Sequence, residues 1–185
     1  MFGKNQPERI LKYMLKRISV TGPESTGKTR LTEWLAGHYQ TLWVPEYARE
    51  YLEKYGPDYT LEDVVAIAHG QLKRENKAAE NTRKILFCDT GLLVTKIWCE
   101  VVFGLCPEWI EQQFRTHQYD LYLLCYPDIP WEPDPLRENP DNRKELFELY
   151  LKTLKDDKFP FQVVKGLGNV RFENARTFVD EILNA

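Results

Sequence analysis

The sequence predicts a single α/β domain, in which a parallel sheet of five strands is covered by helices on both faces. Three observations lead to this fold class. The chain has 185 residues, the length of one ordinary domain. Hydrophobic residues make up 43% of the chain and charged residues 29%, a balance typical of a globular protein. Short apolar segments alternate five times with longer segments of helical spacing, which is the order expected of a parallel sheet with crossover helices.

Five short segments rich in apolar and β-branched residues form the predicted strands. The first leads into a glycine-bearing loop, and the third is followed at once by Asp89. We expect strands at 17–21, 42–45, 84–88, 120–126 and 161–164. Ligands of such sheets bind at the carboxyl ends of the strands, so the residues that follow each strand should gather along one edge.

The predicted helices are delimited by caps and breaks. Thr60 followed by two acidic residues is an N-cap pattern. Gly56-Pro57 and Cys106-Pro107 interrupt helical segments. We expect helices at 27–38, 46–55, 60–80, 91–103, 107–117, 143–156 and 171–183. The stretch 127–142 holds five prolines and predicts an irregular loop.

Charge and cysteine content narrow the classes of protein. The formal net charge is −3, whereas a dedicated nucleic-acid binder usually carries a basic surplus. No apolar run approaches the roughly 20 residues that a membrane helix needs, and no secretory signal is visible. No C-x-x-C pair occurs, so we expect reduced, buried thiols in a cytoplasmic protein at Cys88, Cys99, Cys106 and Cys125.

Residues 22–29 read Gly-Pro-Glu-Ser-Thr-Gly-Lys-Thr and match the phosphate-binding pattern G-x-x-x-x-G-K-[ST]. The glycines let backbone N–H groups face phosphate oxygens, Lys28 supplies charge to the β and γ phosphates, and the Thr29 hydroxyl reaches Mg²⁺. A strand before and a helix after give the required context. The alternative is a glycine turn without a ligand. We predict that ATP with Mg²⁺ is bound by Gly22, Glu24, Ser25, Thr26, Gly27, Lys28, Thr29 and Arg30.

Motifs elsewhere in the sequence indicate which class of nucleotide-dependent reaction uses this loop. A GTPase would carry an Asn-Lys-x-Asp guanine reader, but Asn76-Lys77 is followed by two alanines. A small domain with a proline-rich loop suits phosphoryl transfer to a small acceptor. Such a kinase needs a carboxylate near the metal, a carboxylate for the acceptor hydroxyl and cations for the transition-state charge.

Five residues suit these roles. Asp89 ends an apolar strand, where it could hold Mg²⁺ or deprotonate the acceptor, or serve only as a helix N-cap. Glu46 and Arg49 follow the second strand and are predicted to bind the acceptor, the alternative being an ion pair within the helix. The choice between Asp89 and Glu46 as base stays open. Arg137 and Arg143 predict a lid that closes on the phosphates, or a solvated loop.

Four segments occur in a fixed order: Gly22–Thr29, Glu46–Tyr51, Cys88–Thr90 and Asp128–Trp131. Together they resemble the ribosylnicotinamide kinase domain of the bifunctional NadR proteins, over roughly residues 16–183. The resemblance implies a nucleotide-kinase-like P-loop fold. It also implies ATP-dependent phosphorylation of the 5′-hydroxyl of nicotinamide riboside, which gives nicotinamide mononucleotide in NAD salvage. In related kinases the loop that matches 166–169 holds adenine.

The chain departs from this family in two places. NadR proteins carry an adenylyltransferase domain ahead of the kinase, and residues 1–15 leave room only for a tail or short helix. We therefore expect a stand-alone kinase domain at 16–185. The lid, about 127–143, has Pro135 where the family pattern Asp-Gly-Leu-Arg has glycine.

Nicotinamide riboside contains a cationic pyridinium ring, which aromatic faces bind well. Trp98, Tyr126 and Trp131 follow or end strands on the predicted ligand edge, so we expect them to contact the acceptor, with ordinary core packing as the alternative. The partner is then a small molecule, with no nucleic acid and no membrane. Two other functions stay open: a kinase for another nucleoside or small metabolite, and an ATP-binding regulatory module.

Overall fold

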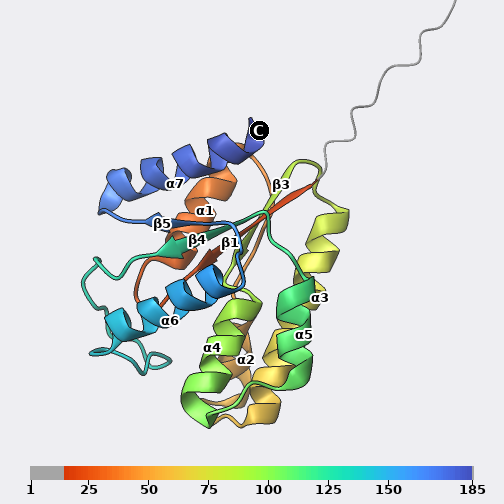
Figure 1. The fold of residues 1–185 in the computed structure, drawn as a ribbon, viewed down its shortest axis with the longest axis vertical. Coiled ribbons are helices and arrows are strands. Elements are labelled where there is room, and N and C mark those ends of the chain that lie inside the picture. Colours follow the sequence, from red (N-terminus) through yellow and green to blue (C-terminus); the bar gives the residue numbers. More distant parts are fainter. Residues whose placement is uncertain (1–14, 185) are drawn as a thin grey trace, which may run out of the picture.

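The computed structural model describes residues 15–184, so the predicted tail or short helix at 1–15 lies almost wholly outside the described residues. Five parallel strands form one sheet in the order β2-β3-β1-β4-β5 (Figure 1). They are β1 (Lys16–Thr21), β2 (Trp43–Val44), β3 (Ile85–Asp89), β4 (Leu121–Cys125) and β5 (Phe161–Val164). Val20 of β1 pairs with Asp89, and Thr21 pairs with Leu124, so the loops after the three central strands begin at one edge.

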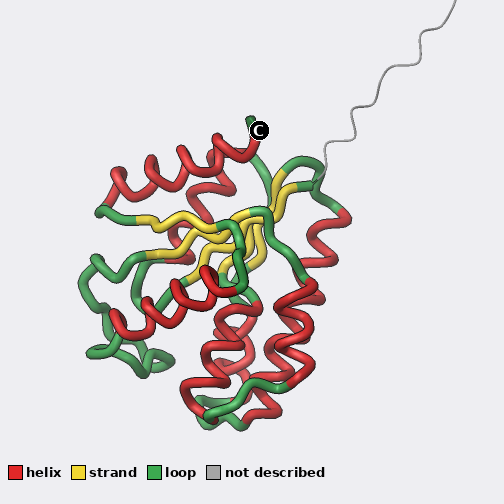
Figure 2. The backbone as a smooth tube through the Cα atoms, in the orientation of Figure 1, coloured by secondary structure: helices red, strands yellow, loops and turns green. Residues whose placement is uncertain are grey.

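Helices cover both faces of the sheet (Figure 2). The described residues form α1 (Lys28–Tyr39), α2 (Tyr47–Tyr55), α3 (Leu61–Glu80), α4 (Leu92–Phe103), α5 (Glu108–Thr116), α6 (Arg143–Asp156) and α7 (Gly168–Leu183). α1 and α7 share one apolar core with the sheet, and α3, α4, α5 and α6 share the other. The predicted fold class, a parallel α/β sheet with helices on both faces, is confirmed.

The two cores follow from the alternation of side chains along the strands. Ile18 and Val20 of β1 belong to the core beneath α1 and α7. Leu86 and Cys88 of β3 belong to the opposite core. All four side chains are fully buried. β3 and β4 contribute apolar side chains to both cores, and β1 lies between them, which makes the three strands a rigid support for the loops at their carboxyl ends.

Two element boundaries differ from the prediction. β2 has two residues instead of four, because it is an edge strand that pairs only with β3. α7 begins at Gly168 instead of residue 171, so the expected adenine loop at 166–169 includes the first turn of a helix. Gly168 has a φ of 53°, a backbone conformation that favours glycine.

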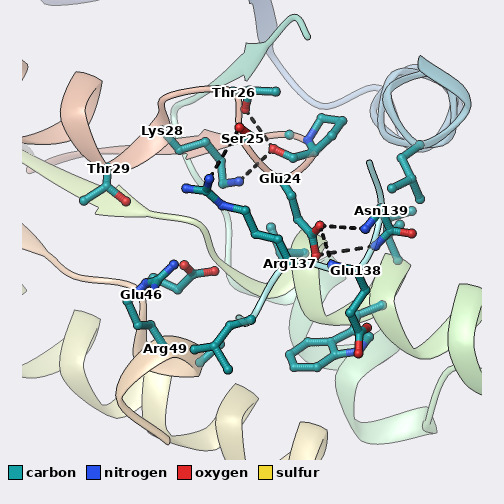
Figure 3. Close-up of a pocket in the computed structure, with 18 of the residues that line it drawn as sticks. Glu24, Ser25, Thr26, Lys28, Thr29, Glu46, Arg49, Arg137, Glu138 and Asn139 are labelled. Carbon is teal, nitrogen blue, oxygen red and sulfur yellow. Dashed lines mark hydrogen bonds between the residues drawn. The ribbon is translucent and has the colours of Figure 1, made fainter. Parts of the chain in front are cut away.

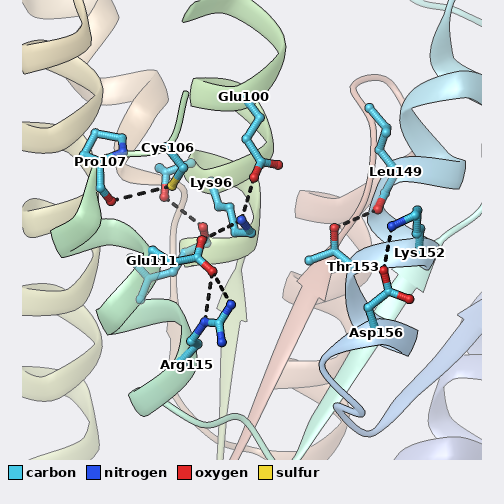
Figure 4. A network of polar contacts seen from close by, with 12 residues as sticks. Lys96, Glu100, Cys106, Pro107, Glu111, Arg115, Leu149, Lys152, Thr153 and Asp156 are labelled. Atoms are coloured by element: carbon cyan, nitrogen blue, oxygen red, sulfur yellow. Dashed lines mark hydrogen bonds and ion pairs between the residues drawn. The ribbon is translucent and has the colours of Figure 1, made fainter. Parts of the chain in front are cut away.

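A cluster of charged residues holds α5 against α4 (Figure 4). Lys96 is nearly buried, and its Nζ lies 2.6 Å from both Glu100 Oε1 and Glu111 Oε2. Arg115 also contacts Glu111, at 2.8 Å. Because the ammonium is paired with two carboxylates, burying it is compatible with a stable fold.

A helix cap, the cysteines and the apolarity of the helices also bear on the sequence predictions. Thr60 and Asp63 form the reciprocal capping box that begins α3. All four cysteines are free thiols, and Cys88, Cys99 and Cys125 are buried as predicted, whereas Cys106 is partly exposed. None of the helices within residues 15–184 is long and apolar enough to cross a membrane.

Candidate active site

The phosphate loop after β1 has the backbone that its glycines permit. Gly22 has a φ of 129°, and a Cβ there would lie 2.8 Å from the carbonyl oxygen of Cys125. Gly27 and Ser25 also have positive φ, at 73° and 52°. The Thr26 hydroxyl donates to the carbonyl of Pro23 at 2.8 Å and fixes the turn. The loop wraps in front of α1, whose N-terminus favours a bound anion.

Lys28 is the first residue of α1, and its side chain reaches back over the loop. Its Nζ donates to the carbonyl of Pro23 at 2.9 Å. This places the ammonium group above the turn whose backbone would cradle phosphate oxygens (Figure 3).

A buried arginine that the sequence analysis missed holds the loop in place. Arg171 of α7 is 2% exposed. It donates to the carbonyl of Thr26 at 2.8 Å and lies 2.6 Å from Asp128 Oδ1. Asp128 accepts a second hydrogen bond from the Gly166 N–H at 2.7 Å. Arg171 and Asp128 therefore connect the phosphate loop to the loops that follow β4 and β5. No local signal distinguishes Arg171 from any other helical arginine in the sequence.

Asp89 lies at the bottom of the site, beside the threonine of the phosphate loop. Thr29 Oγ1 donates to Asp89 Oδ2 at 2.5 Å, and the carboxylate is fully buried. Its Oδ1 has no hydrogen-bond partner among the described residues. Burial, and after it the nearby carboxylate of Glu46, raises the pKa of Asp89 to about 7.

These two side chains fit a magnesium ion. Mg²⁺ takes oxygen ligands and usually keeps several waters and substrate phosphates, so one hydroxyl and one carboxylate suffice from the protein. Within residues 15–184 no group of three or more His, Cys, Asp or Glu side chains could hold a metal. Thr29 and the unpartnered oxygen of Asp89 supply the kind of donors that the predicted cofactor needs.

Glu46 and Arg49 lie on the other side of the cavity, at the start of α2 (Figure 3). Glu46 is the N-cap residue of α2, yet its side chain makes no capping hydrogen bond in the described structure. Arg49 donates from Nη2 to Asp134 Oδ2 at 3.1 Å. The alternative interpretation, an ion pair between Glu46 and Arg49, does not describe the contacts of Arg49, whose acidic partners are Asp134 in the lid and, at 3.8 Å, Glu53 within α2.

The lid closes over the phosphate loop through two loop residues. Glu24 accepts hydrogen bonds from the backbone N–H groups of Glu138 and Asn139, each at 3.0 Å (Figure 3). Ser25 Oγ accepts from the Glu132 N–H at 2.9 Å. Glu24, which we expected to bind the nucleotide, thus binds the lid in this structure.

The two arginines of the lid region differ in their surroundings. Arg137 contacts the phosphate loop, with Nη1 3.5 Å from Ser25 Oγ. Arg143, the first residue of α6, donates to the carbonyls of Ser25 and Ile129 at 3.1 and 2.9 Å. Arg137 lines the cavity, whereas Arg143 bridges two backbone segments beside it.

A cavity of about 400 Å³ runs from the phosphate loop to an apolar end. Trp98 of α4 lies at that end. The ring of Tyr59 packs edge-on against it, with the two ring centroids 4.7 Å apart. The hydroxyl of Tyr59 donates to Glu138 of the lid at 2.8 Å. Tyr59 was not anticipated from the sequence, because it precedes a helix cap far from any strand end.

The structure does not bring every predicted residue to the cavity. All eight predicted nucleotide-binding residues of 22–30 line it, as do Glu46, Arg49, Trp98 and Arg137. Asp89 lies behind Thr29, outside the lining. Tyr126 and Trp131 are also outside it among the described residues. Tyr126 packs on Phe147 with ring centroids 4.9 Å apart, and Trp131 lies 5.6 Å from the Arg143 guanidinium.

By fold and phosphate loop, the chain is a P-loop phosphotransferase of the nucleoside-kinase type. It belongs to the family described as AAA domain, whose model matches residues 17–171.

Two curated relatives carry the resemblance to NadR. The trifunctional NAD biosynthesis/regulator protein NadR of Salmonella typhimurium is 26% identical over 167 residues, which are 86% of this chain and 40% of that protein. NadR of Escherichia coli is 26% identical over 161 residues, 84% of this chain and 39% of that protein. The chain spans about two fifths of the length of these relatives.

Solved structures agree with this assignment. NadR in complex with NAD and AMP-PNP superimposes with a TM-score of 0.73 at 25% identity, covering 92% of this chain and 50% of that chain. NadR in complex with NR gives 0.78 at 22% identity, covering 92% and 51%. Deoxyadenosine kinase from M. mycoides has the same fold, with a TM-score of 0.64 at 17% identity over 89% and 99% of the two chains.

Proposed function

We propose that this chain is an ATP-dependent kinase that phosphorylates the 5′-hydroxyl of nicotinamide riboside and forms nicotinamide mononucleotide. One observation carries the proposal: a single cavity joins the phosphate loop, the carboxylate of Glu46 and the aromatic pair of Trp98 and Tyr59. The similarity to NadR, solved in complexes with NAD and AMP-PNP and with NR, supports the choice of both substrates.

The nucleotide occupies the phosphate-loop end. Backbone N–H groups of 22–29 and the Lys28 ammonium bind its phosphates, and Arg137 adds positive charge from the lid. The Gly166–Asn169 segment binds adenine, where Leu167 and the adjacent Val170 are 57% and 61% exposed and offer apolar surface. Thr29 and Asp89 hold Mg²⁺, which supplies charge neutralisation at the β and γ phosphates.

Glu46 receives the proton of the acceptor hydroxyl. It lines the cavity, whereas Asp89 is buried behind Thr29 and is hydrogen-bonded to it. A base must reach the proton that it removes, so position favours Glu46 and leaves Asp89 to the metal. Arg49 lies beside Glu46 and helps to orient the ribose.

The acceptor base occupies the apolar end. A flat pyridinium cation is attracted to aromatic faces, by about 0.5–2 kcal/mol for each contact. Trp98 and Tyr59 offer such faces, and the carboxylate of Glu138 lies 2.8 Å from the Tyr59 hydroxyl. Aromatic rings together with a carboxylate favour a cationic base over a neutral one.

The test is an acceptor panel with Mg·ATP, in which ADP and phosphorylated products are identified by mass. We expect nicotinamide mononucleotide well above every other product. We also expect Lys28→Ala to lower turnover by at least 100-fold while the melting temperature stays within a few degrees, because the Lys28 ammonium donates its hydrogen bond to a carbonyl in the loop and not to a side chain of the core. A different nucleotide as the main product would support the kinase activity but rule out nicotinamide riboside as the preferred acceptor. ATP hydrolysis without any acceptor product would favour a regulatory module.

A further inference from the structure

In the described part of the chain, the N-terminus of α2 lacks the side-chain cap that its N-cap residue could supply. Glu46 caps this helix by position but not by hydrogen bonding, within the residues that the structure describes. The first N–H groups of a helix need acceptors, and an N-cap side chain usually supplies one. A carboxylate used in this way would be turned toward the helix and away from the cavity. The Glu46 side chain therefore leaves the N–H groups at this helix end to other acceptors.

A side chain from α3 supplies an acceptor. Gln71 Oε1 accepts a hydrogen bond from the N–H of Tyr47, the first residue of α2, at 3.0 Å. Gln71 is 3% exposed, so water does not compete for this bond. β2 is only two residues long and lies at the edge of the sheet, so the strand before Glu46 gives little support. The bond from Gln71 fixes the backbone immediately after Glu46.

The orientation of the Gln71 amide is itself fixed. Its Nε2 donates to Glu75 Oε1 at 3.0 Å, and a carboxylate can only accept. Glu75 is fully buried, and the Tyr119 hydroxyl lies 3.0 and 2.8 Å from its two oxygens. His117 Nε2 lies 2.9 Å from Oε2. Because Glu75 takes the amide nitrogen, the amide oxygen must face Tyr47.

The same buried cluster also lies against the turn after Asp89. A Cβ on Gly91 would stand 2.6 Å from the Tyr119 hydroxyl, so this turn packs directly on the tyrosine. The carbonyl of Thr90 accepts a hydrogen bond from Ser19 Oγ at 2.8 Å. The cluster of Gln71, Glu75, His117 and Tyr119 thus contacts two segments of the site. One carries Glu46, and the other carries Asp89.

We propose that Gln71, oriented by Glu75, is a positioning residue: by accepting the hydrogen bond of the first N–H of α2, it fixes the backbone next to Glu46 and so the direction of the Glu46 carboxylate toward the acceptor. This inference rests on the proposed function in one respect, namely that Glu46 acts on the acceptor. It adds two residues of α3 that do not line the cavity among the described residues.

Gln71→Met tests the inference, because methionine keeps the length of the side chain and removes the acceptor oxygen. Tyr51→Phe is the matched control: it removes another bond between α2 and α3, from Tyr51 to Asp63 Oδ1 at 2.7 Å, without touching the start of α2. Both variants are assayed with ATP and with whichever acceptor the wild type phosphorylates. Melting temperatures are recorded alongside.

We expect Gln71→Met to raise the KM for the acceptor and to lower kcat/KM for it at least tenfold, with the KM for ATP within twofold of wild type. Tyr51→Phe should stay within twofold in all constants. Loss of folded protein lowers kcat alone and cannot raise the KM of one substrate. Should Gln71→Met fail to fold, Glu75→Gln carries the same test, because it removes the group that fixes the amide and should give the same pattern with a smaller change.

Kinetic constants that change equally in Gln71→Met and Tyr51→Phe would overturn the positioning role and leave the proposed function intact. A wild-type protein that phosphorylates no acceptor in the panel would overturn both.

Discussion

At the scale of single residues, the buried charge of Asp89 is expected to lower the free energy of unfolding. Its carboxylate is fully buried, close to Glu46, and has only the Thr29 hydroxyl as hydrogen-bond partner among the described residues. The pKa of Asp89 is raised from 3.8 to about 7, first by burial and then by Glu46. Such an arrangement is expected where a charge is kept for chemistry at the expense of folding free energy.

Replacing this carboxylate should stabilise the protein at high pH. The folded-state pKa lies above the unfolded value of 3.8, so the native state binds the proton more tightly: this stability is full below pH 3.8 and is lost as pH rises from there to about 7. We expect Asp89→Asn to melt at a higher temperature than wild type at pH 8, by about 2–4 °C for each kcal/mol gained, and to be inactive. At pH 4, close to the unfolded pKa of 3.8, most of this advantage should be gone, because the carboxyl is then largely protonated in both states. Calorimetry without nucleotide or Mg²⁺ measures this, and an equal difference at both pH values would contradict it.

At the scale of elements, α2 depends on α3 for its position. The ring of Tyr47 packs where a Cβ on Gly70 would stand, 1.9 Å from its nearest atom. The Arg74 guanidinium lies 4.4 Å from the centre of that ring and also binds Glu50 at 2.7 Å. A glycine in the middle of a long helix is unfavourable by about 1 kcal/mol relative to alanine. Here it allows the helix that carries Glu46 to approach closely.

Gly70→Ala should therefore displace α2. We expect a lower melting temperature, because overpacking costs about 1–3 kcal/mol, and a raised KM for the acceptor with little change in the KM for ATP. Gly37→Ala in α1 is the matched control, since no described atom lies within 4 Å of a Cβ there. That variant should melt at the same or a higher temperature, and its kinetic constants should stay at wild-type values. Equal effects of the two substitutions would refute this account of Gly70.

At the scale of the whole molecule, the lid joins the two halves of the cavity. Glu24 of the phosphate loop binds the backbone at Glu138 and Asn139, and Arg49 of α2 binds Asp134 at 3.1 Å. The nucleotide side and the acceptor side are thus bridged by one segment. A lid closed by contacts to both sides couples the binding of two ligands, each favouring the closed state.

Asp134→Ala should remove this coupling. In the wild type we expect a non-hydrolysable ATP analogue to tighten nicotinamide riboside binding by about fivefold or more, the lower end of typical coupling energies. In Asp134→Ala the factor should approach one, while the affinity for the analogue alone stays within twofold, because Glu24 still binds the lid. Titration calorimetry with each ligand alone and with both measures the factor. Undiminished coupling in the variant would show that the lid acts without this ion pair.

The sequence by itself determined the order of the elements, the phosphate loop and the strand ends at Asp89 and Glu46. These follow from periodicity and short motifs, whose physical causes lie within a few residues of chain. The resemblance to NadR, carried by four such motifs, was confirmed by relatives and by fold.

Only the tertiary structure decided which side chains meet. Arg171 reaches the phosphate loop across 145 residues, and Gln71 reaches the start of α2 across 24. Tyr59 joins Trp98 at the cavity, whereas Tyr126, which directly follows β4, packs on α6 instead. Position at the sheet edge brings a residue near the site, but the direction of its side chain depends on packing against distant elements, which no local pattern encodes.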